Sequence, residues 1–387
     1  MALQQVKIAI VGGGIGGLAT AVALHQRGLT PHVYEQAQAL GEVGAGLTIS
    51  ASATLALNAL NLGDQLADLE PYTPHFGALD PQSGARRSYE ARDLKAYVAR
   101  FGESTRHVHR ADLHQLLANA LPDGCVSTHH RVERIETTES GSRLVFADQS
   151  PVEANLVVAC DGLKSVIREQ QFSPAPATFT GFVAWRGLVD RQALPDLCLD
   201  PHFATFASKD RLFARYPLRR GSLINYVAIA RKPDFTAESW HSHAEIDEVL
   251  AEFAGWHSDV TRLISATPEG CCMKWALYTR QPLQRWVTDR VCLLGDAAHP
   301  MTPFYGMGAA MAIEDGLVLA RCLADSVEVD QALARFEKAR LERGNQMQRV
   351  SLERAETYMG KNPSQRHKPP AAGLQNQMDY NPATVPV

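Results

Sequence analysis

Three glycines in the chain, Gly12, Gly14 and Gly17, have the spacing GxGxxG and follow the apolar run VKIAIV. A helix that begins directly after a strand offers unpaired amides and a positive dipole end, which hold a pyrophosphate, and glycines allow its close approach. Glu35 ends the next apolar run, TPHVYE, 18 residues after Gly17. A carboxylate at this place accepts hydrogen bonds from an adenosine ribose, although Glu35 alone could be a solvated charge at a strand end. Together these features predict a βαβ unit that binds the ADP half of FAD or NAD.

Two further apolar runs end in turns that contain aspartate. NLVVACDG carries Asp161 and RVCLLGDAAH carries Asp296. Continuous apolar runs of this length are typical of strands buried on both faces of a parallel sheet. The two aspartates are therefore candidates for contacts to the same nucleotide, and an ordinary turn aspartate is the alternative for Asp161.

The remaining elements must position these turns. Helices are predicted in residues 50–64, capped by Ser50 or Ser52, in ADLHQLLANAL, and from Gly308 to about Thr357. Between residues 178 and 274 the pattern changes to short alternating strands, with a helix near the end. The sequence predicts an α/β fold, a Rossmann-like dinucleotide-binding domain with an inserted antiparallel sheet and C-terminal helices. Beyond Lys361 the chain is rich in Pro, Gln and Asn, as in a loosely held tail.

Composition excludes several classes of function. A net charge of −4 without a run of Lys or Arg gives no footprint for nucleic acid or an anionic membrane. No window approaches the roughly 20 unbroken apolar residues of a membrane span. The seven cysteines form no CxxC pair, so neither a metal site nor a disulfide framework is predicted, and a disulfide between adjacent Cys271 and Cys272 would be strained. We expect a cytoplasmic protein.

With these motifs in place, the sequence resembles the flavoprotein aromatic hydroxylases of the salicylate and para-hydroxybenzoate hydroxylase family. The second family motif is present as ACDG at 159–162, followed by Ser165 and Arg168, and the third as GDAAHP at 295–300. Finer stretches resemble salicylate-type and hydroxynicotinate-type hydroxylases, namely GEVGAG at 41–46, GFVAWRGLV at 181–189, RYPLRRG at 215–221 and KWALYTRQPLQRW at 274–286.

The resemblance implies noncovalent FAD. Asp296 would hold the ribityl chain, Pro300 and the loop after it would line the isoalloxazine, and Asp161 would lie near the pyrophosphate and the incoming nicotinamide nucleotide. Arg110, in HRADL, would approach the FAD phosphate and ribityl region, with a solvated arginine at a helix start as the alternative. His299 is expected to be structural. The other implied FAD contacts are Val43, Val132, Gly308 and Ala309.

The resemblance also implies an activity. In such enzymes NADH or NADPH reduces FAD, O2 adds at flavin C4a, and the hydroperoxide transfers oxygen to a small aromatic substrate. Because the chain has one GxGxxG fingerprint, the nicotinamide nucleotide should bind transiently. The implied division is a FAD-binding domain of residues 1–78, 104–177 and 275–360, a substrate-binding domain of residues 79–103 and 178–274, and a tail of residues 361–387. A homodimer is possible.

The substrate pocket needs a polar group at the ring hydroxyl. Tyr216 is the first candidate, on a strand that aligns with one bringing a tyrosine to the pocket in hydroxynicotinate hydroxylases, and a buried core tyrosine is the alternative. Arg186 and Arg215 could pair with a substrate carboxylate. Adjacent residues on a strand point to opposite faces, so only one of Arg215 and Tyr216 should line the pocket.

Two departures from the family leave rival functions open. The family commonly has Pro-Asn where this chain has Ala51-Ser52, and Gln where it has Met307. The second departure suggests a non-catalytic flavoprotein as a rival. A halogenase is a weaker rival, because the WxWxIP signature is absent. The aromatic substrate and the choice between NADH and NADPH are not given by the sequence.

Overall fold

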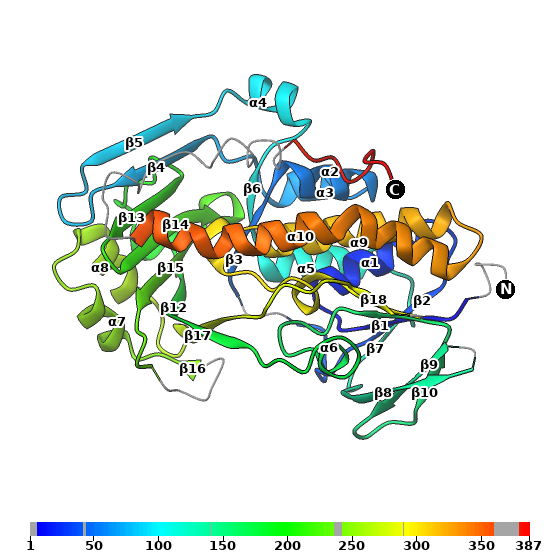
Figure 1. Cartoon of the computed structure of the whole chain (residues 1–387). Helices are drawn as coiled ribbons and strands as arrows, with labels where there is room; N and C mark the ends of the chain where they lie inside the picture. The colour runs from blue at the N-terminus through cyan, green and yellow to red at the C-terminus, as the bar shows by residue number, and fades with distance from the viewer. Residues whose placement is uncertain (1–5, 42–43, 140, 236–241, 289, 360–378) are drawn as a thin grey trace.

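A computed structural model describes residues 6–41, 44–139, 141–235, 242–288, 290–359 and 379–387 (Figure 1). Its strands, within these ranges, form four sheets, of which a six-stranded and an eight-stranded sheet are the largest. Val43 lies outside the described residues. The α/β class and the change to an antiparallel sheet after the parallel one agree with the sequence-based prediction.

The six-stranded sheet has the order β18-β19-β11-β1-β2-β7, and all neighbours except the edge pair β18 and β19 are parallel. Its central strands are short and fully buried, as their runs of aliphatic residues predict. The strands are β1 (Ile8–Val11), β2 (Pro31–Tyr34), β7 (Val126–Ser127), β11 (Leu156–Ala159), β18 (Val287–Thr288) and β19 (Val291–Leu293).

Two helices pack together beside this sheet. Helix α1 (Ile15–His25) connects β1 to β2, and helix α9 (Gly308–Ala324) follows the GDAAHP turn. A Cβ at Gly316 of α9 would lie 2.6 Å from Thr20 Oγ1 of α1, so a glycine is needed where the two helices touch. This close contact fixes the beginning of α9 relative to the glycine-rich turn before α1.

The eight-stranded sheet has the order β16-β17-β12-β15-β14-β13-β4-β5. It contains residues 75–78 and 275–279, which the sequence-based division had assigned to the FAD-binding domain. Its strands are β4 (His75–Leu79), β5 (Arg86–Ala91), β12 (Thr178–Asp190), β13 (Phe203–Ser208), β14 (Arg211–Leu218), β15 (Leu223–Arg231), β16 (Ser242–His243) and β17 (Met273–Thr279).

The two faces of this sheet pack differently. One face carries Trp185 and Phe213 and is covered by α7 (Ile246–Glu252) and α8 (Ser258–Ser265). The other face carries Phe182, which packs on Phe304 of the loop after the GDAAHP turn, with ring centroids 5.2 Å apart. Alternate residues of each strand thus face either the two helices or that loop.

The smaller elements flank the two large sheets. A two-stranded sheet pairs β3 (Gly46–Ile49) with β6 (Arg106–His109), and a three-stranded sheet contains β8 (Val132–Thr138), β9 (Gly141–Phe146) and β10 (Val152–Ala154). Ser50, not Ser52, caps α2, because its hydroxyl accepts from Ala53 N. The remaining α-helices are α2 (Ala51–Ala59), α3 (Gly63–Leu69), α4 (Leu94–Phe101), α5 (Arg110–Asn119), α6 (Val166–Gln171) and α10 (Val329–Met359).

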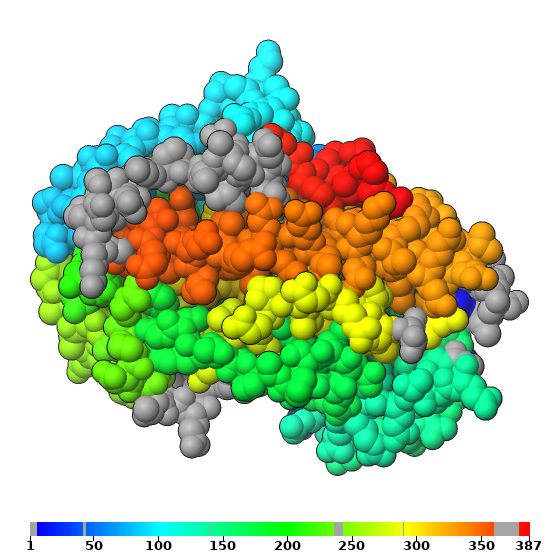
Figure 2. Space-filling model, in the orientation of Figure 1, coloured from blue at the N-terminus to red at the C-terminus, as the bar shows by residue number. Residues whose placement is uncertain are grey.

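Helix α10 runs along the molecule and contacts both large sheets (Figure 1). The final segment, residues 379–387, packs on the helices α9 and α10 (Figure 2). Arg321 donates to the Pro382 carbonyl at 2.8 Å, and Arg335 donates to the Val387 carbonyl at 2.9 Å. The prediction of a loosely held tail is therefore wrong for these residues, because arginines of the two helices bind their carbonyls. In the described part of the chain, no helix combines the length and apolar character that crossing a membrane requires.

Candidate functional site

Three turns meet at one edge of the six-stranded sheet. The register pairs Val11 of β1 with Ala159 of β11, and Ala159 with Leu293 of β19, so the three strands end side by side. The turns that follow them carry the GxGxxG glycines, Asp161 and Asp296. The carboxyl edge of a parallel sheet is where α/β folds bind nucleotides.

The glycine turn leaves an open cradle at the beginning of α1. Gly12 has φ +104°, and a Cβ there would lie 2.4 Å from the Cys160 carbonyl oxygen, so this turn packs tightly on the next one. A Cβ at Gly17 would lie 1.9 Å from the Gly12 oxygen, whereas a Cβ at Gly14 would meet no heavy atom within 4 Å. No side chain caps α1. Its first amides therefore face space that a pyrophosphate fits.

Glu35 lies at the mouth of this cradle. Its Oε2 accepts from Gly13 N at 2.6 Å, and its Oε1 accepts from Ala37 N at 2.8 Å. The carboxylate is thus held in place rather than freely solvated, and each oxygen keeps a lone pair for a ribose hydroxyl. Val132 begins β8 nearby, but its side chain is 8% exposed and packs in the core, so only its backbone could reach a cofactor.

Asp296 follows β19 and faces the beginning of α9. A Cβ placed at Gly308 would lie 3.9 Å from Asp296 Oδ1, and no side chain caps this helix. The side chain of Asp296 is accessible, yet desolvation by the surrounding protein raises the pKa of its carboxyl, and the charges of His299 and Arg110 oppose the rise. The open space beside Gly308 and Ala309 suits a polar chain that hydrogen-bonds Asp296.

Arg110 begins α5 and is half-buried. Its amide donates to the Ala45 carbonyl at 2.8 Å, which joins α5 to the residue before β3. Its positive charge lowers the pKa of both Asp296 and Arg186. Arg110 is thus half-buried and close enough to influence the charge of both the aspartate turn and Arg186 of the eight-stranded sheet.

Asp161 makes the contacts of a helix cap. Its Oδ2 accepts from Ile167 N at 3.3 Å, and a hydrogen bond from Ser165 also lowers the pKa of its carboxyl, which burial raises. Its Oδ1 is buried and has no hydrogen-bond partner in the described ranges. Asp161 therefore has the contacts of a turn residue, and its nucleotide contact remains a prediction.

Arg168 supports the third turn, a role that sequence reasoning missed. Its Nη1 donates to the carbonyls of Ala297 and Ala298, at 2.9 and 2.8 Å, and its Nη2 donates to the Gln281 carbonyl at 2.7 Å. The side chain is 2% exposed, and burial lowers its pKa to about 10. Its presence in the second motif was the available signal, but only the fold shows that it ties that motif to the third.

His299 is structural, as expected. Its Nε2 lies 2.6 Å from Asp315 Oδ2, and both side chains are fully buried. Arg340 donates to the other oxygen of Asp315 at 2.6 Å. Burial alone would raise the pKa of Asp315, but Arg340 and His299 lower it to about 2. Because Asp315 also accepts from Gly295 N at 3.2 Å, this buried group holds the aspartate turn from behind.

The face of the eight-stranded sheet that looks toward the loop after Pro300 carries Arg186 and Tyr216. Arg186 has no hydrogen bond or ion pair with any residue that the structure describes, and its Cζ lies 4.8 Å from the ring centroid of Trp275. Burial lowers the pKa of Arg186. Tyr216 is 5% exposed, and burial raises the pKa of its phenol to about 12, against the opposing charge of Arg186. A guanidinium without an acceptor among the described residues and a protonated phenol thus lie on the same sheet face.

Arg215 points to the other face. It is 1% exposed, and it donates to the carbonyls of Pro201 and Cys198 at 2.9 and 2.8 Å. The alternation expected for Arg215 and Tyr216 is therefore present, and Arg215 is not brought to the side of Arg186. Its contacts give it a structural role.

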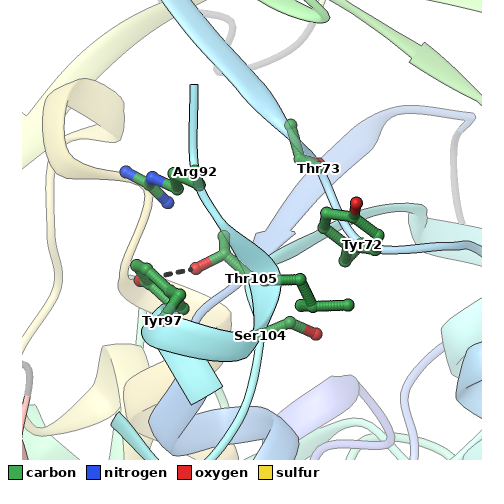
Figure 3. A pocket seen from close by; sticks show the side chains of 7 residues that line it. Tyr72, Thr73, Arg92, Tyr97, Ser104 and Thr105 are labelled. Carbon is green, nitrogen blue, oxygen red and sulfur yellow. Dashed lines mark hydrogen bonds between the residues drawn. The ribbon is translucent and has the colours of Figure 1, made fainter. Parts of the chain in front are cut away.

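A small cavity is lined by side chains that include Tyr72, Thr73, Arg92 and Tyr97 (Figure 3). The cavity lies near Tyr216 through one neighbour: the Tyr216 ring packs against His107 in a tilted arrangement, with centroids 4.4 Å apart, and His107 Nδ1 lies 2.6 Å from Oγ1 of Thr73, which lines the cavity. The cavity has a volume of about 10 Å³, enough for one water molecule but not for an aromatic ring. This cavity therefore cannot hold an aromatic substrate.

The two sequence departures are buried. Met307 is 4% exposed and belongs to the core. Pro300, which was expected to line the isoalloxazine, is also buried. Ser52 donates to Glu314 Oε1 at 2.6 Å, so its hydroxyl joins the buried ion-pair network of α9. Within the described ranges, no group of three or more His, Cys, Asp or Glu side chains could hold a metal ion.

The fold and these turns define a protein that binds FAD, and comparisons with known proteins agree. Residues 5–351 match the family described as FAD binding domain. The chain is 35% identical over 374 residues to 3-amino-4-hydroxybenzoate 2-monooxygenase of Streptomyces platensis, covering 93% of this chain and 90% of that protein. It is 34% identical over 366 residues to 6-hydroxynicotinate 3-monooxygenase of Bordetella bronchiseptica, covering 92% and 93% of the two chains.

Solved structures show the same similarity. The HpxO protein of Klebsiella pneumoniae, in complex with FAD and uric acid, has a TM-score of 0.83 and 26% identity, over 98% of this chain and 94% of that one. A substrate complex of salicylate hydroxylase has a TM-score of 0.78 and 26% identity, over 97% and 93%. The chain belongs to the family of FAD-dependent aromatic hydroxylases, enzymes that use NAD(P)H and O2.

Proposed function

We propose that this hydroxylase acts on a small aromatic or heteroaromatic ring that carries both a carboxylate and a ring hydroxyl. The observation that carries the proposal is the pair of Arg186 and Tyr216 on one sheet face. Arg186 has no protein acceptor among the described residues, and a substrate carboxylate would supply one. Strands β12 and β14 are separated by β15, about 10 Å from one backbone to the other. This separation suits a six-membered ring held at opposite ends.

The names of the relatives support this substrate class. 3-Amino-4-hydroxybenzoate, 6-hydroxynicotinate and salicylate each combine a carboxylate with a hydroxyl on one aromatic ring. Arg186 would hold the carboxylate of such a compound. Tyr216 stays protonated at neutral pH because burial raises its pKa to about 12, so its hydroxyl donates to the ring oxygen.

The groove on the six-stranded sheet would hold FAD along its length. The amides of the glycine turn would bind the pyrophosphate, Glu35 the adenosine ribose and Asp296 the ribityl chain, with Arg110 near the phosphate. When bound, FAD accepts a hydride from NAD(P)H and then activates O2 to oxygenate the substrate. The protein contributes orientation of the ring and exclusion of water, since Phe304 closes the loop against the sheet.

A substrate panel and one substitution test the proposal. Aromatic acids with and without a ring hydroxyl are assayed for stimulated NAD(P)H oxidation and for product. Tyr216→Phe should leave FAD binding intact, slow hydroxylation by about a hundredfold or more and release more hydrogen peroxide. Wild-type turnover and coupling in Tyr216→Phe would make Tyr216 a core residue and refute its role. The absence of substrate-stimulated oxidation throughout the panel would refute the substrate class.

We also propose a cytoplasmic location, which the seven free cysteines favour because such thiols persist in a reducing compartment. A homodimer is proposed as the assembly, and sedimentation of the purified protein tests it.

A further inference from the structure

A buried amide lies beside Tyr216. Asn225 is 0% exposed and pairs with Tyr216 across β15 and β14. Its Oδ1 accepts from Gly46 N of β3 at 2.8 Å. Because an amide N–H can be met only by the oxygen, this bond fixes which end of the Asn225 side chain faces Gly46. The other end, Nδ2, is buried and has no hydrogen-bond partner in the part of the chain that the structure describes.

Asn225 shares the face of Arg186 and Tyr216. Its strand lies between their two strands, and its side chain alternates with Tyr226, which points to the opposite face. A Cβ at Gly46 would lie 2.5 Å from Tyr216 Oη and 2.8 Å from Asn225 Cγ. The phenol and the amide therefore both pack closely against Gly46, which brings their polar ends near each other, and no larger residue fits at position 46.

An amide N–H left without an acceptor costs about 1–3 kcal/mol of stability, so most buried donors are paired. The Oδ1 of Asn225 already accepts a hydrogen bond, whereas its Nδ2 has no acceptor among the residues that the structure describes. A ring hydroxyl oxygen has two lone pairs and can accept from two donors at once. The oxygen that meets the Tyr216 hydroxyl can therefore also meet Asn225 Nδ2.

We propose that Asn225 is a substrate-positioning residue, whose Nδ2 donates to the same ring oxygen that the Tyr216 hydroxyl contacts. The inference rests on the proposed function and deepens it. Arg186 holds the carboxylate end of the ring, while Asn225 and Tyr216 together select for an oxygen at the other end. Asn225 would thus determine how strongly the enzyme prefers a hydroxylated ring over the same ring without the hydroxyl.

Two matched ligand pairs test this role. The oxidised FAD-loaded enzyme is titrated with 4-hydroxybenzoate against benzoate, and with 6-hydroxynicotinate against nicotinate, and the flavin absorbance reports binding. The measured quantity is the ratio of the two dissociation constants within each pair. This ratio cancels any effect of a substitution on the carboxylate end at Arg186.

Two variants probe Asn225. Asn225→Asp keeps an oxygen for Gly46 N but removes the Nδ2 donor, and Asn225→Leu removes the amide while keeping its approximate volume. The wild type should prefer the hydroxylated member of at least one pair, and both variants should reduce that preference about tenfold or more. FAD content and melting temperature show that each variant is folded, and Asn225→Asp keeps the test available if Asn225→Leu fails to fold.

Tyr226→Phe is the matched control. Tyr226 neighbours Asn225 on β15, and its hydroxyl lies 2.9 Å from Thr267 Oγ1 on the opposite face. The control should lose some stability while keeping the wild-type ratio. An unchanged ratio in both Asn225 variants, or a wild-type ratio near one in both pairs, would overturn the inference. If the wild type binds none of the four ligands, the proposed function fails, and the inference falls with it.

Discussion

Arg186 and Arg215 lie in the same sheet, where Arg186 is half-buried and Arg215 is buried. Arg186 is expected to bind the substrate carboxylate, whereas Arg215 is expected to stabilise the fold, so the two offer a direct comparison. Replacing Arg186 with Met should remove the carboxylate partner. A hydrogen bond to a charged group contributes about 1.5–3 kcal/mol, which corresponds to a roughly 10- to 150-fold weaker dissociation constant for a carboxylated ligand. Benzoate binding to the FAD-loaded protein, followed by flavin absorbance, measures this loss.

The stability of Arg186→Met should change little. Arg186 has no hydrogen bond to lose among the described residues, and its contact with the Trp275 ring is worth about 0.5–1 kcal/mol. Removing a partly buried charge without a partner offsets this loss. We therefore expect a melting temperature within about 3 °C of the wild type.

Arg215→Met is the matched control and should behave in the opposite way. Two carbonyls, of Pro201 and Cys198, would lose their donors in a buried place, at about 1–3 kcal/mol each. The melting temperature should fall by several degrees, while the folded fraction keeps its affinity for benzoate. The reasoning is refuted if Arg186→Met loses as much stability as Arg215→Met and binds benzoate as the wild type does.

Three further outcomes follow from single side chains. Asp296→Ala should weaken FAD binding about 10- to 150-fold, from a lost bond of about 1.5–3 kcal/mol, and titration of the apoprotein measures it; unchanged affinity would move the ribityl contact elsewhere. Burial raises the pKa of the Glu70 carboxyl to about 7, although a hydrogen bond from Arg220 N opposes the rise. As pH rises, Glu70 therefore loses its proton in the unfolded chain before it does so in the folded protein. The free energy of unfolding should fall as pH rises from about 4.5 to 7. Glu70→Gln should remove that slope and add about 1–3 kcal/mol at pH 8, as urea unfolding at pH 5 and pH 8 can show, and a gain equal at both pH values would contradict this cause. The Cζ of Arg343 lies 3.9 Å from the ring centroid of Tyr380. Tyr380→Ala should therefore reduce the free energy of unfolding by about 0.5–2 kcal/mol, whereas Tyr380→Phe, which keeps the ring, should reduce it less. Equal losses in the two variants would assign the effect to the hydroxyl.

Features that depend on a few neighbouring residues could be predicted from the sequence. The positive φ values of Gly12 and Gly295 belong to turns whose glycines are readable in the chain, and each turn follows an apolar run that forms a buried strand. Alternation along β14 likewise predicted that Arg215 and Tyr216 would face opposite sides. These outcomes depend on backbone geometry within one element, so local sequence contains the necessary information.

Partner choice over long sequence separations could not be predicted in this way. Arg168 meets carbonyls near residue 298, and Asn225 meets Gly46, 179 positions away. The tail illustrates the same limit, since its composition contains no periodic signal and its docking depends on arginines of α9 and α10. Such contacts arise only when the two large sheets and their helices are packed together.

The sequence by itself determined the family, the strand-and-turn units of the cofactor groove and the short list of polar residues for the substrate. Only the tertiary structure decided which of those residues find hydrogen-bond acceptors within the protein. Arg186 and Arg215 are chemically identical, but backbone carbonyls accept hydrogen bonds from both Nη atoms of Arg215, and no described residue accepts one from Arg186. The physical reason is that hydrogen-bond satisfaction depends on every atom brought within about 3 Å, and most of those atoms come from distant parts of the chain.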